Sequence, residues 1–287
     1  MSVADVTATP RPADPATKPK ARSRGRSRNW RIASIVLANG VPLLVILLWY
    51  WGSRNQPEFV LPGPQDVLVR ALDMLGLDWT LTQQTLISTG RVAIAVTVAM
   101  VLGTALVVTA KYLPVTDGLI TWRITPFFNA APALGWAVIT IYWFGVSGFT
   151  VVFVETAILL PFVMINMWEG LKNLDEELIE MGDSFTRGRV STFRKIVLPM
   201  LLPYGFAALR ISYGTAWKVA LFAELFGAPS GLGYVLNRAR ENLDATTVYA
   251  SFIVIIVMVY AVQKLLIDRL EVILTPQRRA EHRLISK

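Results

Sequence analysis

The sequence contains no cysteine and a single histidine, His282, which lies in a polar C-terminal tail. Disulfide bonds, thiolate nucleophiles and cysteine-based metal sites are therefore excluded, and histidine-dependent triads or zinc centres lose their usual residues. Charged residues are also scarce: they make up 17% of the 287 residues, compared with about 25% in an ordinary soluble domain. This scarcity argues against a water-soluble protein.

Apolar residues, in contrast, make up 54% of the sequence, and the mean hydropathy is +0.49. They collect in runs of about 20 residues, the length that a helix needs to cross the hydrocarbon core of a membrane. We therefore predict an all-α polytopic membrane protein with six transmembrane helices. The expected spans are residues 33–51, 92–110, 122–143, 150–168, 203–226 and 248–267.

The polar segments divide the chain further. The first apolar run is longer than the roughly 7 to 15 residues of a signal-peptide core, so it is expected to stay as an uncleaved membrane helix. The predicted organisation is a disordered basic tail at 1–32, a first membrane helix at 33–52, an external loop and amphipathic segment at 53–88, a core at 89–272 and a second tail at 273–287.

The net charge of +8 would suggest nucleic-acid binding if the basic residues shared a folded face. Eight of them instead lie in the N-terminal tail, among Pro, Ala and Ser and without interleaved aromatic residues. Such a tail is expected to be drawn to anionic lipid headgroups, and no nucleic-acid partner is predicted.

The distribution of Lys and Arg predicts the orientation in the membrane. Eight lie before the first span, five lie between the fourth and fifth spans, and six lie from Lys264 onward. The opposite side has only Arg54, Arg70, Arg238 and Arg240. The protein is therefore expected in a bacterial inner membrane, with both termini in the cytoplasm.

The loop at residues 169–202 is longer than a connector between two spans requires. Within it, apolar residues recur at steps of three and four while acidic residues occupy the other positions, which predicts an amphipathic helix over 171–185 outside the membrane. Because the helix and the inner leaflet are both negative, a protein partner is favoured over lipid, with packing on the protein's own bundle as the alternative. The apolar stripe consists of Leu171, Leu174, Leu178, Met181 and Phe185.

Two ionisable residues, Glu155 and Lys218, fall inside predicted spans, where each costs about 2.5 to 3.5 kcal/mol. They either form an ion pair, which could be purely structural, or line a polar route for an anion, to which Lys218 would add positive potential. Asn129 lies between Pro126 and Pro132, where the third span must loosen, and is a further candidate for the pathway.

Other charged residues lie closer to the ends of the spans. Glu224 is expected at the outer mouth of the fifth span, as an interfacial residue or a contact for another protein. Four basic residues are expected to extend their long stems to the lipid headgroups. They are Arg91, Lys111, Arg123 and Arg210.

Four short motifs occur in a recognisable order. Leu61-Pro62-Gly63-Pro64 comes first, and Glu180-Met181-Gly182 with Ile196-Val197-Leu198-Pro199 occupies the long loop. Ala216-Trp217-Lys218 with Ala223-Glu224, and then Gly231-Leu232-Gly233-Tyr234, follow. Over about residues 60–272 the sequence resembles the type I (MetI-like) permease subunits of binding-protein-dependent ABC importers, and it is most similar to the nitrate, sulfonate and taurine branch.

The resemblance implies a division of labour among several chains. A permease homodimer would form the pathway, cytoplasmic ABC ATPase subunits would drive it, and an external binding protein would deliver a small anion such as a sulfonate, taurine or nitrate. The sequence has no Gly-x-x-x-x-Gly-Lys-Ser/Thr phosphate loop, so ATP and Mg²⁺ are expected on the ATPase, with no cofactor, metal or catalysis on this chain. An ion-coupled secondary transporter is the alternative, although the two halves show no inverted repeat.

The resemblance also suggests functional residues. The ATPase-coupling loop would use Leu174, Leu178, Glu180, Met181, Gly182, Thr186, Gly188, Leu198 and Pro199. Candidate pathway residues are Asn129, Glu155, Trp217, Lys218 and Glu224.

The loop departs from the family pattern, which is Glu-Ala-Ala with a Gly six residues after the Glu. Met181-Gly182 replaces the two alanines, and Thr186 stands at the position of the Gly. A turn that needs positive φ would be strained at Thr186, so the turn either shifts to Gly188 or takes another conformation.

Overall fold

The computed structural model describes residues 28–112, 123, 125–130, 132–174, 176–185 and 189–274. Within these residues all regular structure is helical and no strand occurs, in agreement with the predicted all-α class. The chain divides into two units, Met1–Leu48 and Trp49–Lys287. α1 (Arg28–Asn55) crosses the division, and all later helices belong to the second unit. Most of both predicted tails, together with Thr186 and Gly188, lies outside the described residues.

The proline-rich break after α1 leads into α2 (Pro64–Leu72). Pro64 suits the first position of this helix, because an N–H group there has no intrahelical partner and its absence costs nothing. Trp49 closes this turn, because its Nε1 donates to the carbonyl oxygen of Pro62 at 3.1 Å. α2 then continues into a π-helical turn, η1 (Asp73–Leu77).

α3 (Trp79–Tyr112) begins well before the predicted second span at 92–110. Asp78 caps its N-terminus: Oδ1 accepts hydrogen bonds from the backbone N–H groups of Thr80 at 2.8 Å and Leu81 at 3.4 Å. The last part of the predicted external segment, 53–88, is therefore the first part of one long helix.

Among the described residues, four helical segments are long and apolar enough to cross a membrane. They contain the predicted second, fourth, fifth and sixth spans; α1 covers the first, and the total of six crossings remains a prediction. The four segments are α3; α7 (Gly148–Lys172); η3 (Phe193–Val197) with α10 (Leu198–Gly227); and α12 (Ala245–Val262) with η4 (Gln263–Ile267) and α13 (Asp268–Leu274).

The predicted third span, 122–143, is not one continuous helix. Its described part forms α5 (Thr125–Ala130) and α6 (Ala133–Phe144). Pro132 is extended between them, with ψ 140°, because proline has no N–H to continue the helical ladder. α6 has 12 residues, about 18 Å of helix, which is too short to cross a hydrocarbon core of about 30 Å.

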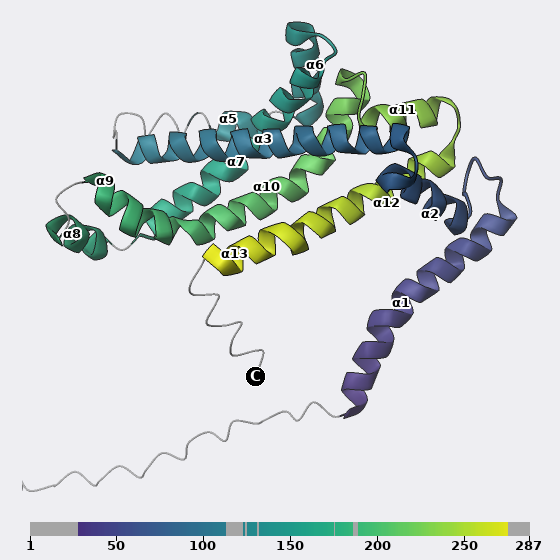
Figure 1. The fold of residues 1–287 in the computed structure, drawn as a ribbon, viewed down its shortest axis with the longest axis horizontal. Helices are drawn as coiled ribbons and strands as arrows, with labels where there is room; N and C mark the ends of the chain where they lie inside the picture. The colour runs from purple at the N-terminus through teal and green to yellow at the C-terminus, as the bar shows by residue number, and fades with distance from the viewer. Residues whose placement is uncertain are drawn as a thin grey trace, which may run out of the picture. The chain divides into compact units, whose positions relative to one another are not determined.

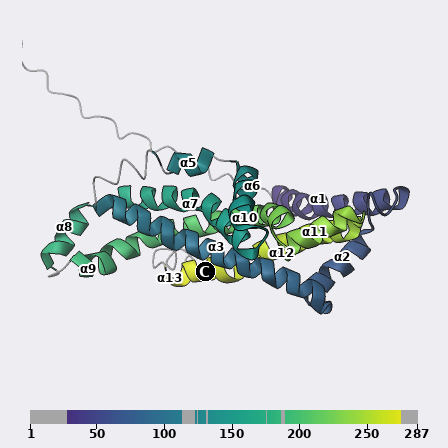
Figure 2. The same cartoon turned by 90° about the horizontal axis from the view of Figure 1, so that it is seen from above.

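The second unit is centred on α3, α7 and α10, which pack against one another along their lengths (Figure 1). Two short helices, α8 (Glu176–Phe185) and α9 (Arg189–Thr192), lie at one end of this group, and α11 (Leu232–Glu241) lies at the other, an arrangement also visible in Figure 2. Small residues allow the close approach of the long helices: a Cβ on Gly103 would lie 2.8 Å from Cγ1 of Val163 on α7.

Gly103→Ala should therefore lower stability, because the added methyl would also lie 3.0 Å from the Val163 Cβ, which cannot move without shifting α7. Overpacking of this kind costs about 1–3 kcal/mol. We expect a lower apparent melting temperature in detergent, measured by tryptophan fluorescence.

Gly90→Ala is the matched control, because it lies in the same helix with no atom within 4 Å of the added Cβ. Its melting temperature should stay unchanged or rise, since alanine favours a helix over glycine by about 0.5–1 kcal/mol. Equal losses in the two variants would contradict tight packing at Gly103.

Candidate functional site

The predicted amphipathic helix over 171–185 is divided between two elements. α7 ends at Lys172, Asn173 leaves the helical conformation, and α8 begins at Glu176. Leu171 and Leu174 precede α8 and are buried in the core, so the prediction that they belong to one exposed stripe is wrong. Leu178 lies within α8.

Gly182 brings α8 against the following turn. It is buried, and a Cβ at this position would overlap the Ile196 side chain on η3 and lie 3.2 Å from Cγ2 of Thr192. A larger residue would therefore have to displace the end of the Ile196 side chain. η3 leads without a break into α10 at Leu198 and Pro199. The substitution of the family's second alanine by glycine thus permits a closer contact.

Two residues beside Gly182 on α8 are exposed. Glu180 is exposed, and the Met181 side chain is 50% exposed. An exposed methionine next to a carboxylate is an adaptable contact surface, since the thioether chain adjusts to irregular partners. α8 is therefore packed on η3 at Gly182, and it presents Glu180 and Met181 as exposed residues.

A buried polar network ties α3, α10 and α11 together at the other end of the unit. Glu224 is 1% exposed, and its Oε1 accepts a hydrogen bond from Nη1 of Arg91 at 2.7 Å. Its Oε2 accepts from Oγ of Ser88 at 2.7 Å and from the backbone N–H of Gly233 at 3.0 Å. Each carboxylate oxygen is thus bonded, as a buried charge requires.

The same network caps the N-terminus of α11, whose first N–H groups have no partners within the helix. Besides the bond from Gly233, the N–H of Leu232 donates to Oγ of Ser88 at 2.7 Å, and the N–H of Gly231 donates to Oε1 of Gln84 at 2.7 Å. The negative charge of Glu224 also lies at the positive end of the helix dipole. Three successive N–H groups at the start of α11 therefore have side-chain acceptors.

The two glycines before and within α11 are required by this arrangement. Gly231 has φ 106°, a conformation that side chains disfavour, and a Cβ there would overlap the carboxylate of Glu224. A Cβ on Gly233 would lie 2.7 Å from the carbonyl oxygen of Leu221. The Gly231-Leu232-Gly233 motif is thus explained by close packing on α10.

Glu155 and Lys218 are not brought together. Glu155 is 0% exposed on α7, and neither carboxylate oxygen has a hydrogen-bond partner among the described residues. Lys218 is exposed on α10, whereas its neighbour Trp217 is buried. The predicted ion pair is absent from the described part of the chain. Asn129 lies in α5, just before the break at Pro132.

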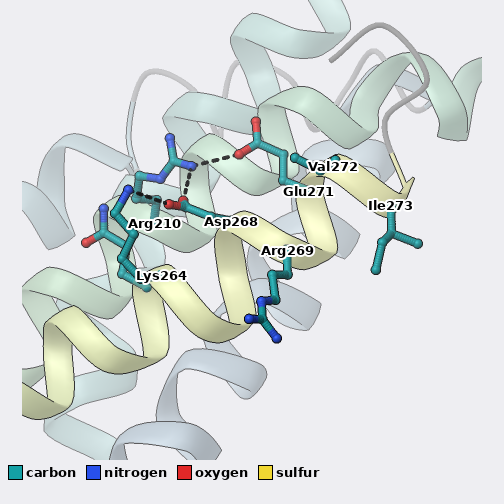
Figure 3. Close-up of a pocket in the computed structure, with 8 residues that line it drawn as sticks. Arg210, Lys264, Asp268, Arg269, Glu271, Val272 and Ile273 are labelled. Atoms are coloured by element: carbon teal, nitrogen blue, oxygen red, sulfur yellow. Dashed lines mark hydrogen bonds and ion pairs between the residues drawn. The ribbon is translucent and has the colours of Figure 1, made fainter. Parts of the chain in front are cut away.

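Arg210 joins α10 to α13. Its Nη2 donates to Oδ1 of Asp268 and to Oε2 of Glu271, both at 2.7 Å, and Nζ of Lys264 lies 3.4 Å from Oδ2 of Asp268 (Figure 3). Arg210 is therefore held by carboxylates of its own chain, whereas the sequence predicted a freely extended side chain. The helix after the predicted sixth span continues to Leu274, and this extension supplies both carboxylates.

Residues 108–280 match the family described as binding-protein-dependent transport system inner membrane component. The chain belongs to this family. It is a multi-pass inner-membrane permease subunit of a transport system and is not itself an enzyme, and the resemblance inferred from the motifs is confirmed.

Several named permeases are similar to this one. The taurine transport system permease protein of Escherichia coli (strain K12) is 27% identical over 253 residues, which cover 85% of this chain and 91% of that protein. A putative aliphatic sulfonates transport permease protein of the same strain is 33% identical over 123 residues, 42% of this chain and 46% of that protein. The formylaminopyrimidine transport permease protein of Halalkalibacterium halodurans is 26% identical over 245 residues, 83% of this chain and 94% of that protein.

One pair of charged side chains in the permease was not predicted from the sequence. Arg91 was expected to reach the lipid headgroups and Glu224 to lie exposed at the outer mouth; both expectations are wrong, because the two form a buried ion pair. Two opposite charges in separate apolar runs at the same expected depth were the available signal. Ser88 gave no signal, since a lone serine in a long helix is unremarkable.

Removing one charge of the buried pair should destabilise the permease strongly. Glu224→Gln leaves the Arg91 guanidinium buried without a carboxylate, which costs about 3–5 kcal/mol. We expect loss of most of the monodisperse, detergent-stable protein, measured by size-exclusion chromatography and thermal unfolding.

The control is Glu241→Gln at the exposed end of α11, which should behave as the parent protein. In addition, Arg91→Gln combined with Glu224→Gln should lose less stability than the two single changes added together. Additive losses would contradict direct coupling of the pair.

Proposed function

We propose that this permease forms, as a homodimer, the membrane pathway of an ATP-driven importer. Cytoplasmic ABC ATPase subunits that bind ATP and Mg²⁺ would drive it, and an external binding protein would deliver the solute. This chain would bind no cofactor of its own. Family membership supports the presence of ATPase and binding-protein partners, and the excess of Lys and Arg on one side supports cytoplasmic termini.

The observation that carries the coupling role is the placement of α8. The helix is packed on η3 through Gly182, and η3 continues directly into the spanning helix α10. A push on the exposed face around Glu180 and Met181 would therefore be transmitted to α10 as a rigid-body displacement rather than absorbed by a loose loop. An ion-coupled secondary transporter would have no use for such a surface.

The proposed solute is a small organic anion with a sulfonate group. Two of the relatives are named for taurine and for aliphatic sulfonates, and one of them aligns with 85% of this chain. The relative named for formylaminopyrimidine shows that such permeases differ in solute, so uptake assays should compare all three compounds. Selectivity would depend largely on the external binding protein.

Lys218 supports a pathway between two copies. It is exposed on α10, nine residues before the helix ends at Gly227, on a face shared with Ile211 and Phe222. A lysine at this depth is costly if it faces lipid. In the proposed dimer this face would border the pathway, where a positive charge attracts an anion. Asn129, Glu155, Trp217 and Glu224 would support the walls rather than all contact the solute.

The coupling role predicts that Met181→Asp abolishes ATP-driven taurine uptake. A buried carboxylate at the ATPase contact would be poorly solvated, so the ATPase should also be lost during purification of the complex. Uptake is measured in proteoliposomes that contain the permease, its ATPase and the binding protein. Glu180→Lys, which reverses the neighbouring charge, should have the same effect.

Leu243→Asp is the control, because Leu243 is 71% exposed on the turn between α11 and α12, far along the chain from α8. It should keep uptake and ATPase binding. Since the parent chain has no cysteine, Met181→Cys provides a single crosslinking site. Crosslinks to lipid alone, with full uptake, would contradict ATPase coupling; uptake without ATP under an ion gradient would support the secondary transporter.

The pathway role predicts a separate effect of Lys218. Lys218→Met should reduce taurine uptake by an order of magnitude or more with the dimer and the ATPase contact intact, whereas Lys218→Arg should restore most of it. Phe222→Leu, on the same exposed face, is the matched control. Unchanged uptake by Lys218→Met would remove Lys218 from the pathway and leave the coupling proposal standing.

A further inference from the structure

A cavity of about 790 Å³ opens between α10 and the η4–α13 segment. Its charged lining consists of Arg210, Lys264, Asp268, Arg269 and Glu271 (Figure 3). The volume lies within the range of about 300–1,000 Å³ that is usual for sites of small ligands. The coupling surface on α8 and the Arg91–Glu224 network do not contribute to it.

The charges in this cavity are unequally satisfied. Asp268 and Glu271 both accept from Arg210 at 2.7 Å, so both carboxylates are engaged. Lys264 is 57% exposed and has one ion pair, at 3.4 Å with Asp268. Arg269 has no hydrogen bond or ion pair in the described part of the chain. Three cations against two carboxylates leave a positive lining, with Lys264 and Arg269 the most available donors.

The Arg210 guanidinium is only partly hydrogen-bonded. Its Nε–H is buried and has no partner among the described residues. Its Nη2 is already held by the two carboxylates, so Arg210 is fixed in position rather than free to swing into solvent. Arg210 and its two carboxylates thus form a fixed group of side chains beside Lys264 and Arg269.

The surroundings of the cavity are apolar and exposed. They belong to Ala245–Leu274, one of the four segments that are long enough to cross a membrane, and they lie in its last turns. Cations at the end of a spanning helix are at the level of lipid headgroups, while exposed leucines beside them face acyl chains. The exposed apolar neighbours are Leu265, Leu266, Leu270, Ile273 and Leu274.

We propose that this cavity binds the headgroup of an anionic phospholipid. Lys264 and Arg269 donate to the phosphodiester oxygens, and the acyl chains lie along the exposed leucines of η4 and α13. Arginine suits such a phosphate because its planar fork can donate two parallel hydrogen bonds. Both donors lie on the η4–α13 segment, and the site does not depend on which solute the permease carries.

The test uses the full-length permease in detergent, with bound lipid measured by native mass spectrometry. After incubation with palmitoyl-oleoyl phosphatidylglycerol or phosphatidylcholine, the parent should retain the anionic lipid at least fivefold better. Lys264→Gln combined with Arg269→Gln should abolish this preference. Arg238→Gln combined with Arg240→Gln, which removes two exposed cations from α11, should keep it.

Three results would overturn the proposal. Equal retention of the two lipids by the parent would exclude an anionic headgroup site, and an unchanged preference in the Lys264–Arg269 variant would place the site elsewhere. Displacement of the lipid by millimolar glycerol phosphate, with equal binding of that soluble phosphate, would assign the cavity to a free anion. Retained α-helical circular dichroism and taurine uptake in the variant would show that its loss of lipid does not come from misfolding.

A second variant removes the two carboxylates that hold Arg210 in the cavity. Asp268→Asn combined with Glu271→Gln frees Arg210 and makes the cavity more positive, so retention of phosphatidylglycerol should rise relative to the parent. Loss of retention in this variant would mean that the carboxylates themselves hold the ligand, and would contradict recognition of phosphate by the cations.

Discussion

The constraint on which this structure depends is that polar groups within a membrane protein must find their partners inside the protein. Each unsatisfied backbone or side-chain polar group in hydrocarbon costs several kcal/mol, because the bilayer core contains no water to form the missing hydrogen bond. The Arg91–Glu224 pair answers this constraint where α3, α10 and α11 meet. One carboxylate there accepts from a guanidinium, a serine hydroxyl and a backbone N–H, and the start of α11 is capped by the same residues.

Close packing of helices is a second feature, separate from the polar network. Small residues at helix interfaces let the backbones approach one another. Glycines provide the approach at Gly103 on α3, at Gly182 on α8 and at Gly233 on α11. The last two belong to motifs that the sequence displays, which explains why motifs of a transport family can consist largely of small residues. Their role is to place helices at contact distance.

Much of this arrangement follows from the sequence, and the rest fails for identifiable reasons. Long apolar runs located the four long helices, and Pro132 located the break between α5 and α6. Helical periodicity could not divide 171–185, because Leu171 and Leu174 continue the spacing of α8 across the end of α7 while facing the core. A repeated step of three and four describes one helix or two equally well.

The partners of the charged residues were harder to predict, because pairing depends on where distant helices meet. Arg210 is near the middle of α10 and finds its carboxylates on a helical extension beyond the predicted sixth span, which was expected to end at residue 267. Thr186 and Gly188 lie outside the described residues, so the shift of the turn remains a prediction.

Glu155 and Lys218, two charged residues inside predicted spans, have different surroundings. Glu155 is enclosed by α7 and its neighbours without a hydrogen bond to either oxygen, whereas Lys218 is open on the surface of a spanning helix. The same constraint applies to both: a charged side chain in a membrane must be paired with a protein group or solvated by water. For Lys218, which its own chain leaves exposed, the proposed dimer would place a second copy or a hydrated pathway beside the charge. For Glu155 no outside surface is reachable, because the residue is 0% exposed on α7.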